Sequence, residues 1–136
     1  MSKRAFHGQL LLVVWGLLAM TSGSAIAQKY KAPPSEVLLL PKFCWSQYMS
    51  NVKGPQYEIP RRYCGVGMNH YCPALIELNR AMKSTGSKRR QHLVVAKRGI
   101  QYTLRWMKPY PSCPIRAQVE ASSREVDSML RFASPR

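Results

Sequence analysis

The sequence predicts an all-α protein: a small helical-hairpin bundle of about four helices, held by two disulfides. Three observations predict this fold class. Segments in the C-terminal half carry apolar residues at the three- and four-residue spacing of an amphipathic helix, and no segment gives a clear strand signal. Prolines and glycines separate these segments by short turns, as between antiparallel helices. Four cysteines follow an apparent export signal, and an even number in an exported chain favours disulfides.

The first 27 residues have the layout of a secretory signal peptide. Lys3 and Arg4 form a positive region, an apolar run of 11 residues follows, and Ala25 and Ala27 form an A-x-A cleavage site. A membrane-spanning helix needs about 20 apolar residues, so this run is too short for an anchor. We therefore expect residues 1–27 to be removed and the protein to be exported to the periplasm or, alternatively, to the extracellular space.

The remaining chain is long enough for one domain with a modest core. Residues 28–42 begin with a stretch rich in proline and lysine and are predicted to be a flexible leader, and residues 43–136 a single helical domain. A short helix is expected over 43–49. Residues 51–67 contain three glycines and two prolines, which predicts a long loop.

Residues 70–83 are predicted to form the next helix, with Asn69 as its cap and Pro73 in a first turn that tolerates proline. A break around Gly86 follows, and Ser87 is a candidate cap for the helix after it. The last helix is expected over 115–132. Its predicted buried stripe consists of Ile115, Val119, Ser122, Val126, Met129 and Leu130.

Residues 88–108 carry two apolar faces on one predicted helix. The first face consists of Leu93, Ala96, Ile100, Leu104 and Met107. The second consists of Val95, Tyr102 and Trp106, so the helix is expected to pack on both sides as the central element, with both aromatic residues in the core. Gly99 costs a helix about 1 kcal/mol against alanine, and a close helix contact there would explain it.

A strongly basic balance accompanies this fold. The full chain has a net charge of +15, and removal of the signal leaves 19 cations and six acids, a net charge of +13. Such a charge favours anionic partners, and export makes nucleic acid a less natural one than an acidic protein, a lipid headgroup or a polysaccharide. The candidate binding face consists of Lys88, Arg89, Arg90, Lys97, Arg98, Arg105 and Lys108.

The four cysteines, Cys44, Cys64, Cys72 and Cys113, are predicted to form two disulfides. Their spacings of 19, 7 and 40 intervening residues contain no C-x-x-C pair of the kind that zinc sites use. Three pairings are open. We expect Cys72 to pair with Cys113, because each is placed near a helix start at the same end of the bundle, and Cys44 to pair with Cys64.

The order of helix, short turn, longer helix, proline and last helix resembles tetratricopeptide-repeat and related helical-hairpin proteins over about 40 residues. The resemblance rests on Leu75, Leu78, Ala81, Ala96, Ile100, Thr103 and Pro109 or Pro111. Thr103 departs from the pattern, which has a small alanine there. The stretch CGVGMNHYCPALIELNRA is also similar to segments of small exported bacterial proteins of unknown role. The resemblance implies a periplasmic scaffold for protein contacts.

The sequence offers few groups for chemistry. No G-x-S-x-G elbow is present, and the six acids are too few to suggest a carboxylate pair, so we expect no enzyme and no cofactor. His70 and Met68 make copper or haem ligation conceivable. A disulfide-stapled loop, with Gly65 and Gly67 for turn geometry, is the favoured interpretation, so no metal site is predicted. The basic sites at 61–62 and 88–90 leave open a processed peptide precursor.

The prediction is thus an exported, disulfide-stabilised helical binding or scaffold protein whose basic helix face contacts an acidic partner. One alternative is a cationic protein that binds the anionic membrane surface peripherally or an envelope polysaccharide. The other is a periplasmic metal- or haem-handling protein.

Overall fold

The structure is a computed structural model that describes residues 31–133 of the 136-residue chain. The proposed signal peptide, residues 1–27, lies outside the described residues. The all-α prediction is confirmed, because residues 31–133 contain helices and no strand. No helix in this part of the chain combines the length and the apolar character that crossing a membrane requires.

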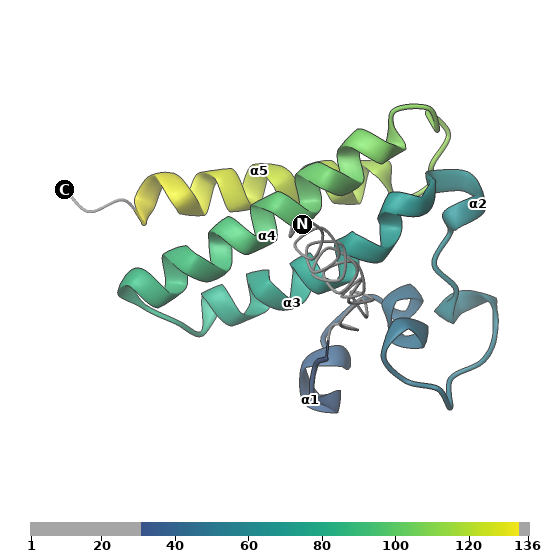
Figure 1. Cartoon of the computed structure of the whole chain (residues 1–136), viewed down its shortest axis with the longest axis horizontal. Helices are drawn as coiled ribbons and strands as arrows, with labels where there is room; N and C mark the ends of the chain where they lie inside the picture. Colours follow the sequence, from purple (N-terminus) through teal and green to yellow (C-terminus); the bar gives the residue numbers. More distant parts are fainter. Residues whose placement is uncertain (1–30, 134–136) are drawn as a thin grey trace, which may run out of the picture.

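Three long helices form the body of the molecule: α3 (Tyr71–Met82), α4 (Gly86–Met107) and α5 (Arg116–Phe132). Each begins and ends within two residues of the helix predicted over 70–83, 88–108 or 115–132. Helix α4 packs against both neighbours, and Figure 1 shows it between them. The prediction of a central helix is therefore confirmed.

Neither α3 nor α4 begins at the cap that the sequence suggested. Helix α3 follows directly on the 3₁₀ helix η4 (Val66–His70), so the chain is already helical before α3 and Asn69 does not cap it. Helix α4 begins after Thr85, two residues before the expected cap at Ser87. No side-chain cap hydrogen bond is present at either start, so packing rather than capping positions both helices.

The main core lies between the three long helices. The first apolar face of α4 is buried as predicted: Leu93, Ala96, Ile100 and Met107 are each 0% exposed. Helix α5 adds Val119 and Val126 to this core, and α3 adds Tyr71. The hydroxyl groups of Tyr71 and Ser122 share a hydrogen bond of 2.9 Å, which pairs two buried polar groups.

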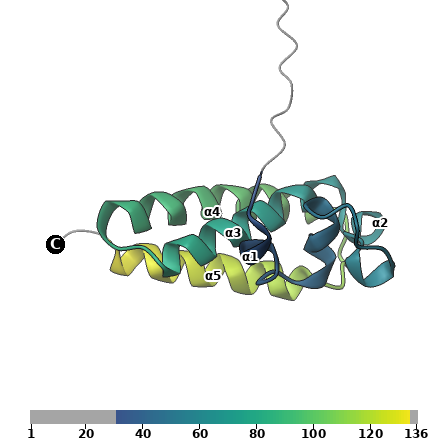
Figure 2. The same ribbon diagram turned by 90° about the horizontal axis from the view of Figure 1, so that it is seen from below.

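The N-terminal region consists of short elements: α1 (Pro34–Val37), η2 (Lys42–Gln47), η3 (Pro55–Tyr57) and α2 (Arg61–Cys64). Element η2 corresponds to the short helix predicted over 43–49. Segment 51–67, predicted as a loop, contains η3, α2 and the start of η4. Figure 2 shows α1 alongside α3 and α2 at one end of the bundle.

Part of the expected flexible leader, 28–42, packs on the bundle instead. Val37 of α1 is only 1% exposed, and Leu40 joins a second core with Ile76 of α3. The carboxylate of Glu36 accepts a bidentate hydrogen bond from Arg80 of α3, the shortest contact being 2.7 Å. The prolines fix the backbone of this segment, and the apolar residues between them supply contacts that hold it.

The four cysteines form two disulfides, as predicted, but the expected pairing was wrong. Cys44 pairs with Cys72, and Cys64 pairs with Cys113. The expectation failed because Cys64 does not lie in an open loop: it ends α2, which lies against the connection between α4 and α5. Cys44, in η2, lies beside the start of α3 instead.

Gly99 lies at a close contact between α3 and α4, as predicted. A Cβ atom at Gly99 would lie 2.8 Å from Cβ of Ala74 and 3.1 Å from the carbonyl oxygen of His70. Real Cβ atoms do not approach that closely, so a side chain here would push the helices apart. The helix-propensity cost of glycine is therefore offset by backbone packing.

Candidate binding surface on helix α4

The structure divides the seven cations predicted to form one binding face. Arg89 is half-buried in the first turn of α4, and Lys97 is engaged with α5. The exposed members are Lys88, Arg90, Arg98, Arg105 and Lys108. Lys88 and Arg90 lie at the start of the helix, and the other three follow Lys97.

Lys97 connects α4 to α5. Its ammonium lies 2.7 Å from a carboxylate oxygen of Asp127, and both side chains are more than a third exposed. An exposed pair of this kind contributes little to stability because water screens it. Its local effect is to neutralise one cation in the middle of the predicted strip.

Arg98, Arg105 and Lys108 form what we call the cationic cluster, on the C-terminal half of α4. All three are exposed, and none forms an ion pair with another described residue. They cover about 15 Å of helix at 1.5 Å per residue. The negative end of the helix dipole lies here, so cations are favourable in this last turn even without an acidic partner.

An aromatic row, Tyr102, Trp106 and Tyr110, lies beside the cationic cluster. These residues recur every fourth position and are 36%, 45% and 36% exposed. The expectation that Tyr102 and Trp106 lie in the core was wrong. The second apolar face of α4 is covered only in part, because the element against it is the short η4 rather than another long helix.

Glycines of the η4 segment provide the surface on which this row lies. A Cβ atom at Gly67 would lie 2.6 Å from Cβ of Trp106, and one at Gly65 would lie 2.7 Å from the ring of Tyr110. Gly65 also has φ +83°, a conformation that favours glycine. The hydroxyl of Thr103 donates to the carbonyl of Gly67 at 3.0 Å, so a threonine at this position joins α4 to η4.

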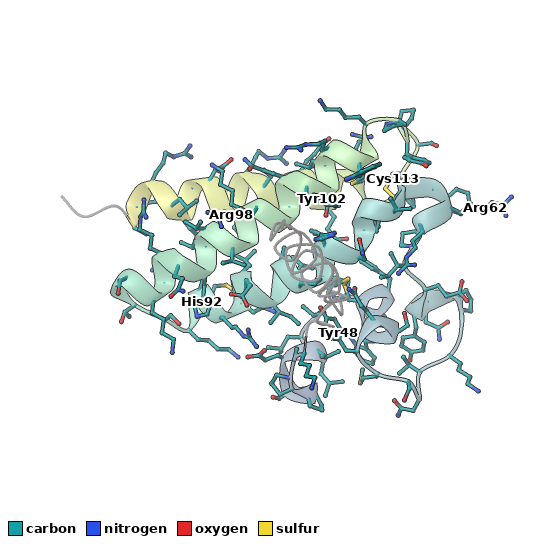
Figure 3. All side chains as sticks on the ribbon, in the orientation of Figure 1. Tyr48, Arg62, His92, Arg98, Tyr102 and Cys113 are labelled. Atoms are coloured by element: carbon teal, nitrogen blue, oxygen red, sulfur yellow. A yellow bond between two sulfur atoms is a disulfide. The ribbon has the colours of Figure 1, made fainter. Side chains whose placement is uncertain are left out.

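A groove of about 330 Å³ lies between α3 and α4, next to the aromatic row. Its lining includes His70, Pro73, Val95, Arg98, Gly99 and Tyr102. The rings of His70 and Tyr102, which both line the groove, are 4.1 Å apart between centroids. Figure 3 shows Arg98 and Tyr102 on α4, one turn apart.

A buried carboxylate, Glu77, also borders the groove but is already paired. One of its oxygens lies 2.8 Å from Arg80, and the other lies 2.7 Å from Nδ1 of His92. Because Arg80 also binds Glu36, this network joins α1, α3 and α4. The uncompensated charge that remains at the groove is that of Arg98.

The two residues considered as metal ligands lie in different surroundings. Met68 is fully buried in the main core, and His70 is exposed and packs on Tyr102. All four cysteines are in disulfides. Within residues 31–133, no group of three or more histidine, cysteine, aspartate or glutamate side chains is arranged to hold a metal ion.

Sequence reasoning missed Tyr102, Trp106 and Tyr110 as surface residues. A signal was available, since on a helical projection Tyr102 lies next to Arg98 rather than opposite the charged residues. The resemblance to helical-hairpin repeats stays a prediction. The chain matches no protein family model, no curated protein and no solved structure.

Proposed function

We propose that this chain is an exported binding protein that contacts an acidic protein through the cationic cluster and the aromatic row of α4. One observation carries the proposal: three cations with no acidic partner among residues 31–133 lie beside three exposed aromatic side chains, on the C-terminal half of α4 and the three residues that follow it. Two disulfides within a domain of this size fit an oxidising, exported environment.

The chemistry of this surface favours a protein partner. Arginine, tyrosine and tryptophan are enriched among the side chains that contribute most to protein–protein affinity. The aromatic side chains are held by η4, so they lose little conformational freedom when a partner binds. The cations supply attraction at a distance and raise the association rate with an acidic surface.

The same surface supports a second candidate function, peripheral binding to an anionic membrane. Trp106 and Tyr110 are exposed beside Lys108, and aromatic residues with nearby cations are typical of proteins at the membrane interface. An envelope polysaccharide would use the same cations. These partners differ from an acidic protein in that no second protein is needed.

The test uses the chain from residue 28 with both disulfides formed. It captures partners from a native envelope extract, after which each recovered protein is purified and titrated separately. We expect an acidic protein whose affinity falls by about tenfold or more in the Arg105→Glu, Lys108→Glu variant and falls further with salt. A matched control, Lys53→Glu with Arg124→Glu, makes the same charge change on exposed residues elsewhere and should weaken binding by less than about threefold.

Sedimentation with vesicles decides between the two candidates. One possible result is that the protein binds vesicles of anionic phospholipid, leaves them at moderate salt and does not bind neutral vesicles. That result would favour a membrane over a protein as the partner. Equal loss of partner affinity in the cluster variant and the matched control would contradict a specific role for α4. So would the recovery of no acidic protein.

A further inference from the structure

The groove between α3 and α4 is a defined hollow in the surface that carries the proposed function. Its volume, about 330 Å³, is at the small end of the range for ligand sites. It is open to solvent, and its walls are mostly carbon: Pro73 on α3, Val95 on α4 and the ring of Tyr102. Such a space suits one or two side chains of a bound segment rather than a whole cofactor.

Two small residues line the groove where α3 and α4 are in close contact. Gly99 and Ala74 meet there, and a single added Cβ at Gly99 would already be only 2.8 Å from Ala74. Because neither residue has a side chain that can swing outward, the groove is present before a partner binds. A preformed pocket lowers the entropy cost of binding.

The charge at the groove favours a negatively charged ligand. Glu77, the carboxylate at its border, is paired with Arg80 and with His92. Arg98 is exposed and has no ion-pair partner among residues 31–133. An incoming carboxylate can therefore bind the guanidinium of Arg98 without meeting a free negative charge.

We infer that this groove is the anchor site for the acidic partner of the proposed function, on which this inference rests. It accepts one apolar side chain of an extended acidic segment, between Val95 and Tyr102. The carboxylate of an adjacent residue of that segment pairs with Arg98. Arg105 and Lys108, the two members of the cationic cluster that follow Tyr102, attract the rest of the segment.

Backbone amide NMR of the disulfide-bonded chain tests the inference with three synthetic peptides. The first has a central leucine between two acidic residues on each side, the second replaces the leucine by glycine, and the third replaces the acids by their amides. We expect the first to shift the amides of Val95, Gly99 and Tyr102, and to bind about tenfold more tightly than either of the others. NMR detects this binding even at dissociation constants of about 1 mM.

A charge-reversed pair of variants on the same helix supplies the control. Arg98→Glu should lower the affinity for the leucine peptide by about tenfold. Arg90→Glu, two turns away, should lower it by less than about threefold. Both residues are exposed, so we expect both variants to fold. An amide spectrum that matches the parent away from the substituted residue verifies this. Equal losses in the two variants would overturn the role of Arg98.

The outcomes separate this inference from the proposed function. Equal affinity for the leucine and glycine peptides, or no shift at the three groove amides, would overturn the anchor site. Partner affinity that still depends on Arg105 and Lys108 would then leave the proposed function standing. If that dependence were also absent, the proposed function would fail as well.

Discussion

The bundle of α3, α4 and α5 and the N-terminal region over residues 31–70 are built on different principles. The bundle consists of helices of 12, 22 and 17 residues that share one core. No element of the N-terminal region exceeds six residues, and its side chains are divided between a smaller core on α3 and the edge of the main core, which Cys64 and Met68 join. Isolated helices that short are unstable, because they form too few hydrogen bonds to offset nucleation. The cross-links of Cys44 and Cys64 to the rest of the chain hold this region in place.

This difference shows which features of the sequence determine the position of each part of the structure. In the bundle, the position of each helix follows from its apolar stripe. In the N-terminal region, position follows from a few long-range contacts: Cys44 with Cys72, Cys64 with Cys113, and Glu36 with Arg80. Removal of such a contact should destabilise the N-terminal region locally without unfolding the bundle.

Removal of the disulfides should have the largest effect. The bond from Cys64 to Cys113 closes 49 residues, and in the chain-entropy model its loss lowers the free energy of unfolding by about 4 kcal/mol. The bond from Cys44 to Cys72 closes 28 residues and contributes about 3.5 kcal/mol on the same basis. We expect paired cysteine-to-alanine variants to show these losses in denaturant unfolding.

Hydrogen exchange then shows which region of the protein each loss of stability affects. Without the bond from Cys44 to Cys72, amides of η2 should exchange faster while those in the middle of α4 stay protected. Loss of protection throughout α4 in that variant would contradict the division into two regions.

Truncation in the two cores should give the next largest effects. Leu93→Ala, in the main core, should lower the free energy of unfolding by about 3 kcal/mol, because it leaves a cavity between long helices. Leu40→Ala, in the second core, should cost about 2 kcal/mol, because a short segment can relax around the gap. Chemical denaturation measures both. A greater loss for Leu40→Ala would mean that the smaller core holds the fold.

Substitution of Gly99 should have a smaller effect, of a sign opposite to that expected from helix propensity. Alanine would favour the helix by about 1 kcal/mol, but the contact with Ala74 should cost about 2 kcal/mol. We therefore expect Gly99→Ala to destabilise by about 1 kcal/mol. Gln101→Ala, on the exposed side of α4, is the matched control and should change stability by less than about 0.5 kcal/mol. A stabilised Gly99→Ala protein would show that the helices can separate at no cost.

The smallest expected effect is a loss of stability at alkaline pH. Burial raises the pKa of Tyr71 above its ordinary value of 10.0, although the hydrogen bond with Ser122 opposes this shift. A raised folded-state pKa means that the folded protein holds the phenol proton more tightly, so the stabilisation is complete below pH 10 and is lost as the pH rises through the folded-state pKa. Unfolding midpoints between about pH 8 and about pH 11 should fall less steeply in Tyr71→Phe than in the parent. Equal slopes would mean that Tyr71 does not contribute.

Much of the bundle could be predicted because amphipathic periodicity carries information about both a helix and its buried side. Leu93, Ala96, Ile100 and Met107 are buried as their spacing indicated. The cysteine pairing could not be predicted in this way. It depends on how segment 51–67 folds, and a segment with three glycines, two prolines and no periodicity gives no signal for α2.

The candidate surface was predictable in part. The cations of α4 follow from the sequence, and Arg98, Arg105 and Lys108 are exposed. The exposure of Trp106 was not predictable from its apolar character, because it depends on η4 being too short to cover the second face of α4. The ion pair between Lys97 and Asp127 depends on the rotation of α5 against α4, which periodicity alone does not fix.

The two disulfides interleave along the chain, in the order Cys44, Cys64, Cys72, Cys113. Every peptide bond between Cys44 and Cys113 therefore lies inside at least one covalent loop. A single cut by a protease anywhere in this interval, including the basic sites at 61–62 and 88–90, leaves the two pieces joined. In the oxidising, exported environment that the disulfides suggest, this arrangement would keep the cationic cluster and the groove on one covalent molecule after a first cleavage.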